Sequence, residues 1–158
     1  MRTRSSADSV GLLAIRLMLA ATFIFHGAQI LFGLFGGPGV QGFADRNQIS
    51  SLLSWLVGAA ELGGGVSMLL GFLVKVGGLA IAAVMAGAII RVHLPNGFDI
   101  VHQGMEYALT ELVFAFAVAS MGAGAYSLDA LLSRPRSVKT TIPEHAACPS
   151  DRNASPHE

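Results

Sequence analysis

The chain has 158 residues, of which 53% are hydrophobic and only 13% are charged. Soluble domains carry about 25% charged residues, so this composition is typical of an integral membrane protein. Basic and acidic residues balance to a formal net charge of zero, which argues against nucleic acid as a partner, because that partner needs a clustered basic face. The single cysteine, Cys148, provides neither a disulfide framework nor a thiolate metal site, and we expect no metal.

Four apolar runs follow one another along the chain, at about residues 10–35, 52–73, 76–94 and 105–121. Each approaches or exceeds the ~20 residues that a helix needs to cross a bilayer. We therefore predict an all-α fold, an antiparallel membrane four-helix bundle over residues 10–132. The remaining segments are a polar leader over 1–9, a loop over 36–51 and a disordered polar tail over 133–158.

The basic residues outside the apolar runs predict the orientation of the bundle. Arg2 and Arg4 precede the first run, and Lys75 lies between the second and the third. Arg134 follows the fourth run, whereas the other two loops hold only Arg46. By the positive-inside rule, both termini and the central turn are expected in the cytoplasm.

Polar and ionisable side chains interrupt the apolar runs, and counting 1.5 Å per residue places most of them in the outer half of the membrane. This group consists of His26, Gln29, Glu61, Arg91, His93, Glu106 and Glu111. An ionised side chain at the centre of a membrane helix costs about 2.5–3.5 kcal/mol, so pairing, protonation or water must relieve it. Arg16 alone lies toward the cytoplasmic side, where its guanidinium is expected to snorkel to the surface.

Small residues repeat every three or four positions beside three of these charges. Gly58 and Gly65 accompany Glu61, Ala83 and Gly87 precede Arg91, and Ala108, Ala115 and Ala119 accompany Glu111. Membrane helices pack closely along such stripes, so these three charges are expected to face the bundle axis. We predict a charge-assisted contact between Arg91 and Glu61 or Glu111. The alternative is that this pairing only fixes the helix register.

The third run is expected to end just after Arg91. Pro95 lacks a backbone donor, and Gly97 permits a positive φ, so the helix should stop and turn here. Tyr107, shortly beyond this break, and Trp55 are typical of the aromatic residues at a membrane interface.

Six short motifs, in a fixed order, resemble the DoxX family. They are Arg16, Phe25-His26-Gly27-x-Gln29, Ala60-Glu61-Leu62-Gly63-Gly64, His93-Leu94-Pro95-Asn96-Gly97-Phe98, Glu106-Tyr107-Ala108-Leu109 and Tyr126-Ser127-Leu128-Asp129. One departure is Ile30, where such proteins commonly carry lysine. The resemblance implies a four-helix, multi-pass protein of the bacterial cytoplasmic (inner) membrane. Some relatives are subunits of thiosulfate:quinone oxidoreductase, and a mycobacterial relative is tied to a membrane complex for redox defence.

The first functional hypothesis is a membrane subunit of a quinone- or thiol-linked oxidoreductase complex, with quinone as the candidate cofactor. His26, Glu61 and Glu111 are the candidate catalytic residues, and Gln29, Arg91, His93 and Glu106 the candidate substrate-binding residues. A carboxyl or an imidazole would move the protons that accompany quinone chemistry. The chain has no flavin fingerprint and no Fe–S cysteines, so a redox-enzyme partner subunit would supply the electrons. Whether this chain is itself an enzyme is left open.

Two alternatives use the same residues differently. In a scaffold or assembly factor, the charges would only hold the bundle together. In a small proton-linked carrier, the buried ionisable groups would mark a substrate path across the lipid bilayer. Four spans without an inverted repeat make a lone carrier the less favoured of the two.

Overall fold

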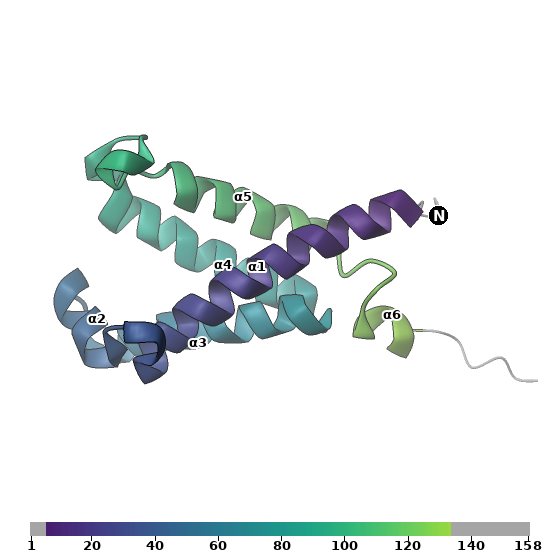
Figure 1. Ribbon diagram of the computed structural model, residues 1–158, viewed down its shortest axis with the longest axis horizontal. Helices are drawn as coiled ribbons and strands as arrows, with labels where there is room; N and C mark the ends of the chain where they lie inside the picture. The colour runs from purple at the N-terminus through teal and green to yellow at the C-terminus, as the bar shows by residue number, and fades with distance from the viewer. Residues whose placement is uncertain (1–5, 134–158) are drawn as a thin grey trace, which may run out of the picture.

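The computed structural model describes residues 6–133, and every regular element in this range is a helix (Figure 1). The four longest are α1 (Ser6–Phe32), α3 (Ser51–Leu70), α4 (Val74–Ala88) and α5 (Glu106–Met121). The predicted all-α class is therefore confirmed. The predicted tail beyond Ser133, with Cys148, and the first five residues of the predicted leader lie outside the described residues.

Three stretches of the described chain are long and apolar enough to cross a membrane: Ser6–Phe32, Ser51–Leu70 and Val74–Asn96. They coincide with the first three predicted spans. Helix α5 has 16 residues, which is shorter than a typical membrane helix, so the fourth span stays a prediction. Large apolar side chains cover the outer surfaces of the helices, and Met18 and Val76 are 61% and 63% exposed. So many exposed apolar side chains are suited to lipid contact.

Helix α3 packs against both α1 and α4, and α5 packs against α4 and α1. Glycines allow the closest approach. A Cβ at Gly27 of α1 would lie 2.5 Å from the backbone nitrogen of Leu62 on α3, and one at Gly64 would lie 2.7 Å from Ile81 on α4. The core between the helices contains Leu19, Phe23, Met68, Ile81 and Val118, each at most 1% exposed.

Replacing Gly27 by alanine is expected to lower the free energy of unfolding by about 1–3 kcal/mol, because the added methyl group meets backbone that cannot move aside. The matched control is Gly63→Ala on α3, where a Cβ meets nothing within 4 Å. Unfolding of both variants in mild detergent would measure the difference. Equal stability of the two variants would contradict the close packing of α1 on α3.

The prediction of a loop over residues 36–51 is wrong, because this segment contains a short helix, α2 (Gly39–Asn47). A single 3₁₀ turn, η1 (Leu34–Gly36), follows the end of α1 at Phe32. Helix α2 lies against α3: Ala44 is 2% exposed, and the hydroxyl of the buried Ser54 donates to the carbonyl of Val40 at 2.7 Å. Packing on α3 therefore stabilises a helix too short and too polar to be evident from its own sequence.

The prediction that Arg16 snorkels to the surface is wrong, because its side chain is buried and only 1% exposed. Its Nε and Nη2 donate to the carbonyl of Met68, near the end of α3, at 3.0 and 2.8 Å. Its Nη1 donates to the carbonyls of Ala123 and Tyr126, beyond α5, at 2.7 and 2.8 Å. We call these four residues the Arg16 clasp. It joins α1, the end of α3 and the segment after α5 through one side chain.

The segment after α5 makes further contacts beside the clasp. The short helix α6 (Leu128–Leu132) is capped by Ser127, whose hydroxyl accepts from the backbone N–H of Ala130 at 3.1 Å. The backbone N–H of Asp129 donates to the carbonyl of Gly71 at 3.0 Å, and the Asp129 carboxylate accepts from the N–H of Leu73 at 3.3 Å. Residues 122–132 are thereby docked on the turn between α3 and α4.

Candidate functional site

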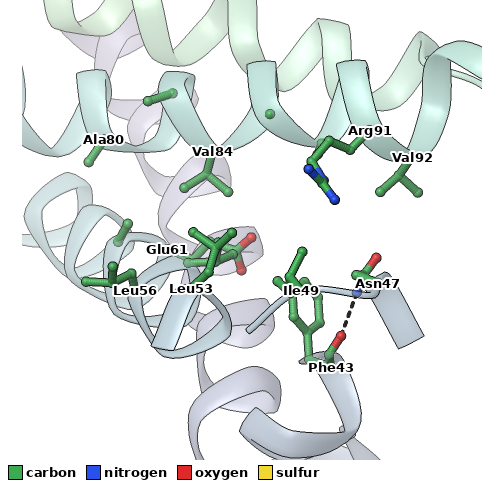
Figure 2. A pocket seen from close by; sticks show the side chains of 15 residues that line it. Phe43, Asn47, Ile49, Leu53, Leu56, Glu61, Ala80, Val84, Arg91 and Val92 are labelled. Atoms are coloured by element: carbon green, nitrogen blue, oxygen red, sulfur yellow. Dashed lines mark hydrogen bonds between the residues drawn. The ribbon is translucent and has the colours of Figure 1, made fainter. Parts of the chain in front are cut away.

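A cavity of about 440 Å³ lies between α3 and α4, with α2 and the residues after it forming a third wall (Figure 2). All but three of the residues that line it are apolar; the exceptions are Asn47, Glu61 and Arg91. The cavity is within the range of small-molecule sites, which are mostly apolar with a few polar groups that orient the ligand. We call it the α3–α4 cavity.

Glu61 is placed in this cavity by the buried face of α3. Ser54, Gly58, Gly65 and Met68 recur at helical spacing with Glu61, and all are buried. The glutamate is 6% exposed, and its Oε2 has no hydrogen-bond partner among the described residues. A buried carboxyl oxygen without a partner is costly in a folded protein, so this atom is a candidate contact for a proton or a ligand.

Arg91 lies at the other side of the cavity, on a π-helical turn, η2 (Ile89–His93), which continues α4. The proline ring of Pro95 would clash with the carbonyl of Arg91 in a regular α-helix, so the helix changes its hydrogen-bonding register here. It then ends as predicted, with Gly97 at φ 78°. Figure 2 shows the Arg91 side chain reaching toward the wall that carries Ile49 and Asn47.

The predicted ion pair of Arg91 with a glutamate is not formed. Among the described residues, no ion pair joins Arg91 to Glu61 or Glu111, and the Arg91 side chain makes no hydrogen bond there. The structure does bring Arg91 and Glu61 to one cavity, but on different walls. The cavity thus offers a donor and a carboxyl that do not satisfy one another.

The third wall was not predicted from the sequence. It comprises Phe43 and Asn47 of α2 and Ile49 after it. The side-chain amide of Asn47 donates to the carbonyl of Phe43 at 2.9 Å, which leaves its Oδ1 as an acceptor. The only sequence signal for this wall was the group of polar residues at 45–47 beside apolar Phe43 and Ile49.

Glu111 is as buried as Glu61, at 5% exposed, but it does not line the α3–α4 cavity. It belongs to the buried face of α5 with Ala108, Ala115 and Ala119, as the stripe of small residues predicted. Its Oε2 also lacks a hydrogen-bond partner in the described chain. The two buried glutamates therefore occupy separate environments.

The other predicted site residues lie outside the cavity. His26 is exposed and packs edge-on against Phe25, at 5.7 Å between ring centroids, whereas Gln29 is half-buried against Gly37. Their proposed roles stay predictions.

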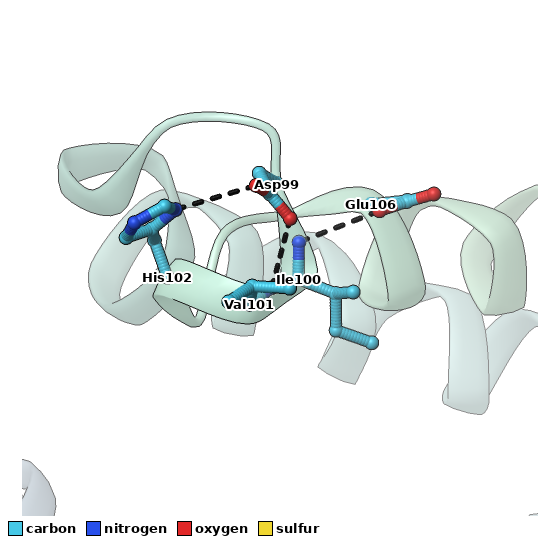
Figure 3. A network of polar contacts seen from close by, with 5 residues as sticks. All are labelled: Asp99, Ile100, Val101, His102 and Glu106. Atoms are coloured by element: carbon cyan, nitrogen blue, oxygen red, sulfur yellow. Dashed lines mark hydrogen bonds and ion pairs between the residues drawn. The ribbon is translucent and has the colours of Figure 1, made fainter.

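His93 and Glu106 hold the connection between α4 and α5 in place. His93 Nδ1 donates to the carbonyl of Gln103 at 2.8 Å, and a carboxylate oxygen of Glu106 accepts from the N–H of Ile100 at 3.3 Å. Figure 3 shows this connection, in which Asp99 caps η4 (Ile100–His102). These contacts give both side chains a structural role, and substrate binding by either remains a prediction.

The fold and the apolar outer surface define the chain as an α-helical membrane protein. The family model of DoxX matches residues 11–94, which is more than half of the chain. The chain belongs to the DoxX family. Comparisons with curated proteins and with solved structures gave no match.

Proposed function

We propose that the chain is the membrane subunit of a quinone-linked oxidoreductase complex, and that the α3–α4 cavity binds the quinone head group. One observation carries the proposal: the apolar cavity has the unpaired guanidinium of Arg91 on one wall and, on another, Glu61, whose buried Oε2 has no partner among the described residues. A protein in which charges only stabilised the bundle would be expected to pair them. The scaffold hypothesis is therefore disfavoured by this geometry.

A quinone ring suits the cavity chemically. The ring is flat and apolar, and its two carbonyl oxygens lie on opposite edges. Arg91 would donate a charge-assisted hydrogen bond to one carbonyl. Glu61 would exchange a proton with the other oxygen when the quinone is reduced or the quinol is oxidised. The exposed Leu53 and Leu56 on the rim would let the apolar tail of the quinone pass into lipid.

The membrane arrangement that goes with this function is an antiparallel four-helix bundle in the bacterial cytoplasmic membrane, with α5 as the fourth span and both termini in the cytoplasm. The Arg91 end of the cavity would then lie toward the outer surface. Electrons would come from a partner subunit with its own redox cofactor. A thiol-linked partner is the alternative, and a proton-linked carrier would use Glu61 in the same cavity.

Purification in gentle detergent, followed by mass spectrometry, is expected to recover bound quinone and a redox partner. In binding titrations with a short-chain quinone, Arg91→Ala is expected to weaken binding by about ten- to a hundredfold, since a hydrogen bond to a charged group contributes about 1.5–3 kcal/mol. Glu61→Leu should weaken binding too, whereas Glu61→Gln keeps a hydrogen-bonding group and should bind nearly normally.

The matched control for Arg91 is Arg46→Ala, because Arg46 is an exposed arginine of the neighbouring helix α2 that does not line the cavity. It should bind quinone as the wild type does. Equal binding by Arg91→Ala and Arg46→Ala would exclude the cavity as the quinone site.

A further inference from the structure

The α4–α5 connection, residues 97–105, exposes a group of apolar side chains. Phe98, Ile100 and Val101 are 59%, 51% and 80% exposed. We call these three side chains the apolar tip. Single exposed apolar side chains are common on proteins, whereas a group of them indicates a surface that contacts something other than water.

The polar groups of the connection are bonded within it. The Asp99 carboxylate accepts from the backbone N–H of Val101 at 2.9 Å, and the Glu106 carboxylate accepts from that of Ile100 at 3.3 Å. The backbone N–H groups of residues 102–106 donate to carbonyls earlier in the connection. Every backbone N–H from Ile100 to Glu106 therefore has a protein partner, so this backbone can leave bulk water without losing hydrogen bonds.

The apolar tip is held on a tightly packed support. A Cβ at Gly104 would lie 2.5 Å from the carbonyl carbon of Phe98 and 2.7 Å from the carbonyl oxygen of Gly97, so the two sides of the connection are in direct contact. Figure 3 shows the Ile100 side chain on the opposite side of the chain from the Asp99 carboxylate. The surface that covers the tip must therefore come from outside the connection.

Membrane lipid is the surface that fits the apolar tip. The candidate span Val74–Asn96 ends directly before the connection, and Ile90 and Leu94 near its end are 67% and 52% exposed. The tip thus continues the apolar surface of this helix. The 23 residues of the span rise about 35 Å, slightly more than the ~30 Å of hydrocarbon, so the connection begins at the level of the lipid head groups.

We propose that the α4–α5 connection is an interfacial anchor, whose apolar tip inserts among the lipid head groups at this end of the molecule. The chain has no lysine or arginine from residue 92 to 133, so insertion depends on apolar contact and not on attraction to anionic lipid. The bond from His93 to Gln103 joins the anchor to η2 and so fixes the level of Arg91. The proposal does not depend on quinone binding, because the tip does not line the α3–α4 cavity.

The test is tryptophan fluorescence of the full chain in phosphatidylcholine vesicles. Trp55→Phe removes the only tryptophan, and Val101→Trp then places one in the apolar tip. Its emission is expected to shift to shorter wavelength. A spin label near the top of the lipid acyl chains should quench most of this emission, since interfacial elements insert about 5–10 Å. A label at the chain ends should quench it less, and aqueous acrylamide hardly at all. Anionic lipid or added salt should leave the quenching unchanged.

Phe98→Trp is a second probe, which replaces one aromatic ring by another and should behave as Val101→Trp does. Arg46→Trp, also with Trp55→Phe, is the matched control, because Arg46 is exposed on the polar helix α2 at the same end of the molecule (Figure 1). It should be quenched by acrylamide and only weakly by labelled lipid. The proposal fails if acrylamide quenches both tip probes as it quenches the control, because the tip then lies in water. It also fails if neither quencher reaches them, because a second copy or a partner protein then covers the tip.

Discussion

Arg16→Leu is expected to destabilise the protein strongly, because it removes the donor at the centre of the Arg16 clasp. The guanidinium donates four hydrogen bonds to three main-chain carbonyls from two parts of the chain. Each buried acceptor left without a donor costs about 1–3 kcal/mol, so the free energy of unfolding should fall by several kcal/mol. Thermal unfolding in mild detergent would measure the loss.

Arg16→Lys should lie between the wild type and Arg16→Leu. A lysine keeps the positive charge, but its single ammonium cannot reproduce the planar fork that reaches Met68 on one side and Ala123 and Tyr126 on the other. Arg46→Leu is the control, because Arg46 is exposed on α2. If Arg16→Leu unfolds at the same temperature as Arg46→Leu, the clasp does not stabilise the fold.

The clasp could not be predicted from local sequence. Its carbonyl acceptors are 52, 107 and 110 residues away from Arg16, and any residue could supply them. One signal was present, however. Arg16 lies at helical spacing with Leu12, Leu19 and Phe23, and all four are buried on the same face of α1. This place on the apolar face of α1 indicated that Arg16 is buried and does not reach water. A buried guanidinium requires several hydrogen-bond acceptors.

The sequence did predict the features that depend on length, hydropathy and local backbone chemistry. Three candidate spans coincide with long apolar runs, and the turn at Gly97 follows from its tolerance of positive φ. The stripes of small residues correctly placed Glu61 and Glu111 on buried faces.

The same prediction was wrong for Arg91, because Ala83, Gly87 and Arg91 are exposed along the open α3–α4 cavity. The predicted contact of Arg91 with a glutamate was wrong. The face of a helix on which a residue lies gives the direction of its side chain, but not the distance between the ends of two side chains. Arg91 and Glu61 share a cavity without touching.

The missed helix α2 shows the limit of the same reasoning. A nine-residue segment that contains Gly39 and Gly42, with Asp45 and Arg46, has neither the length nor the hydropathy of a span. Its structure depends on contacts with α3, such as the bond from Ser54 to Val40, which the segment itself does not encode. Because α2 supplies one wall of the cavity, the site was incomplete in the sequence-based prediction: Glu61 and Arg91 were identified, but Asn47 was not.

Filling the α3–α4 cavity is expected to weaken quinone binding strongly without damaging the fold. Gly87 of α4 lines the cavity, and a Cβ at this position would meet nothing within 4 Å. Gly87→Phe therefore adds a large side chain to open space, and it replaces a residue that lowers helix stability by roughly 0.5–1 kcal/mol relative to alanine. We expect at least tenfold weaker binding with thermal unfolding no lower than in the wild type.

Gly63→Phe separates a filled cavity from a general effect of added bulk. Gly63 of α3 is also helical and open to substitution, with nothing within 4 Å of its Cβ, but it does not line the cavity. It should bind quinone normally. Val84 also lines the cavity from α4, the helix that carries Gly87, so Val84→Trp should narrow the cavity and weaken binding as Gly87→Phe does. Normal binding by both cavity variants would place the quinone elsewhere. Weak binding by Gly63→Phe as well would show that bulk on any helix disturbs the protein, because this glycine has no contact with the cavity.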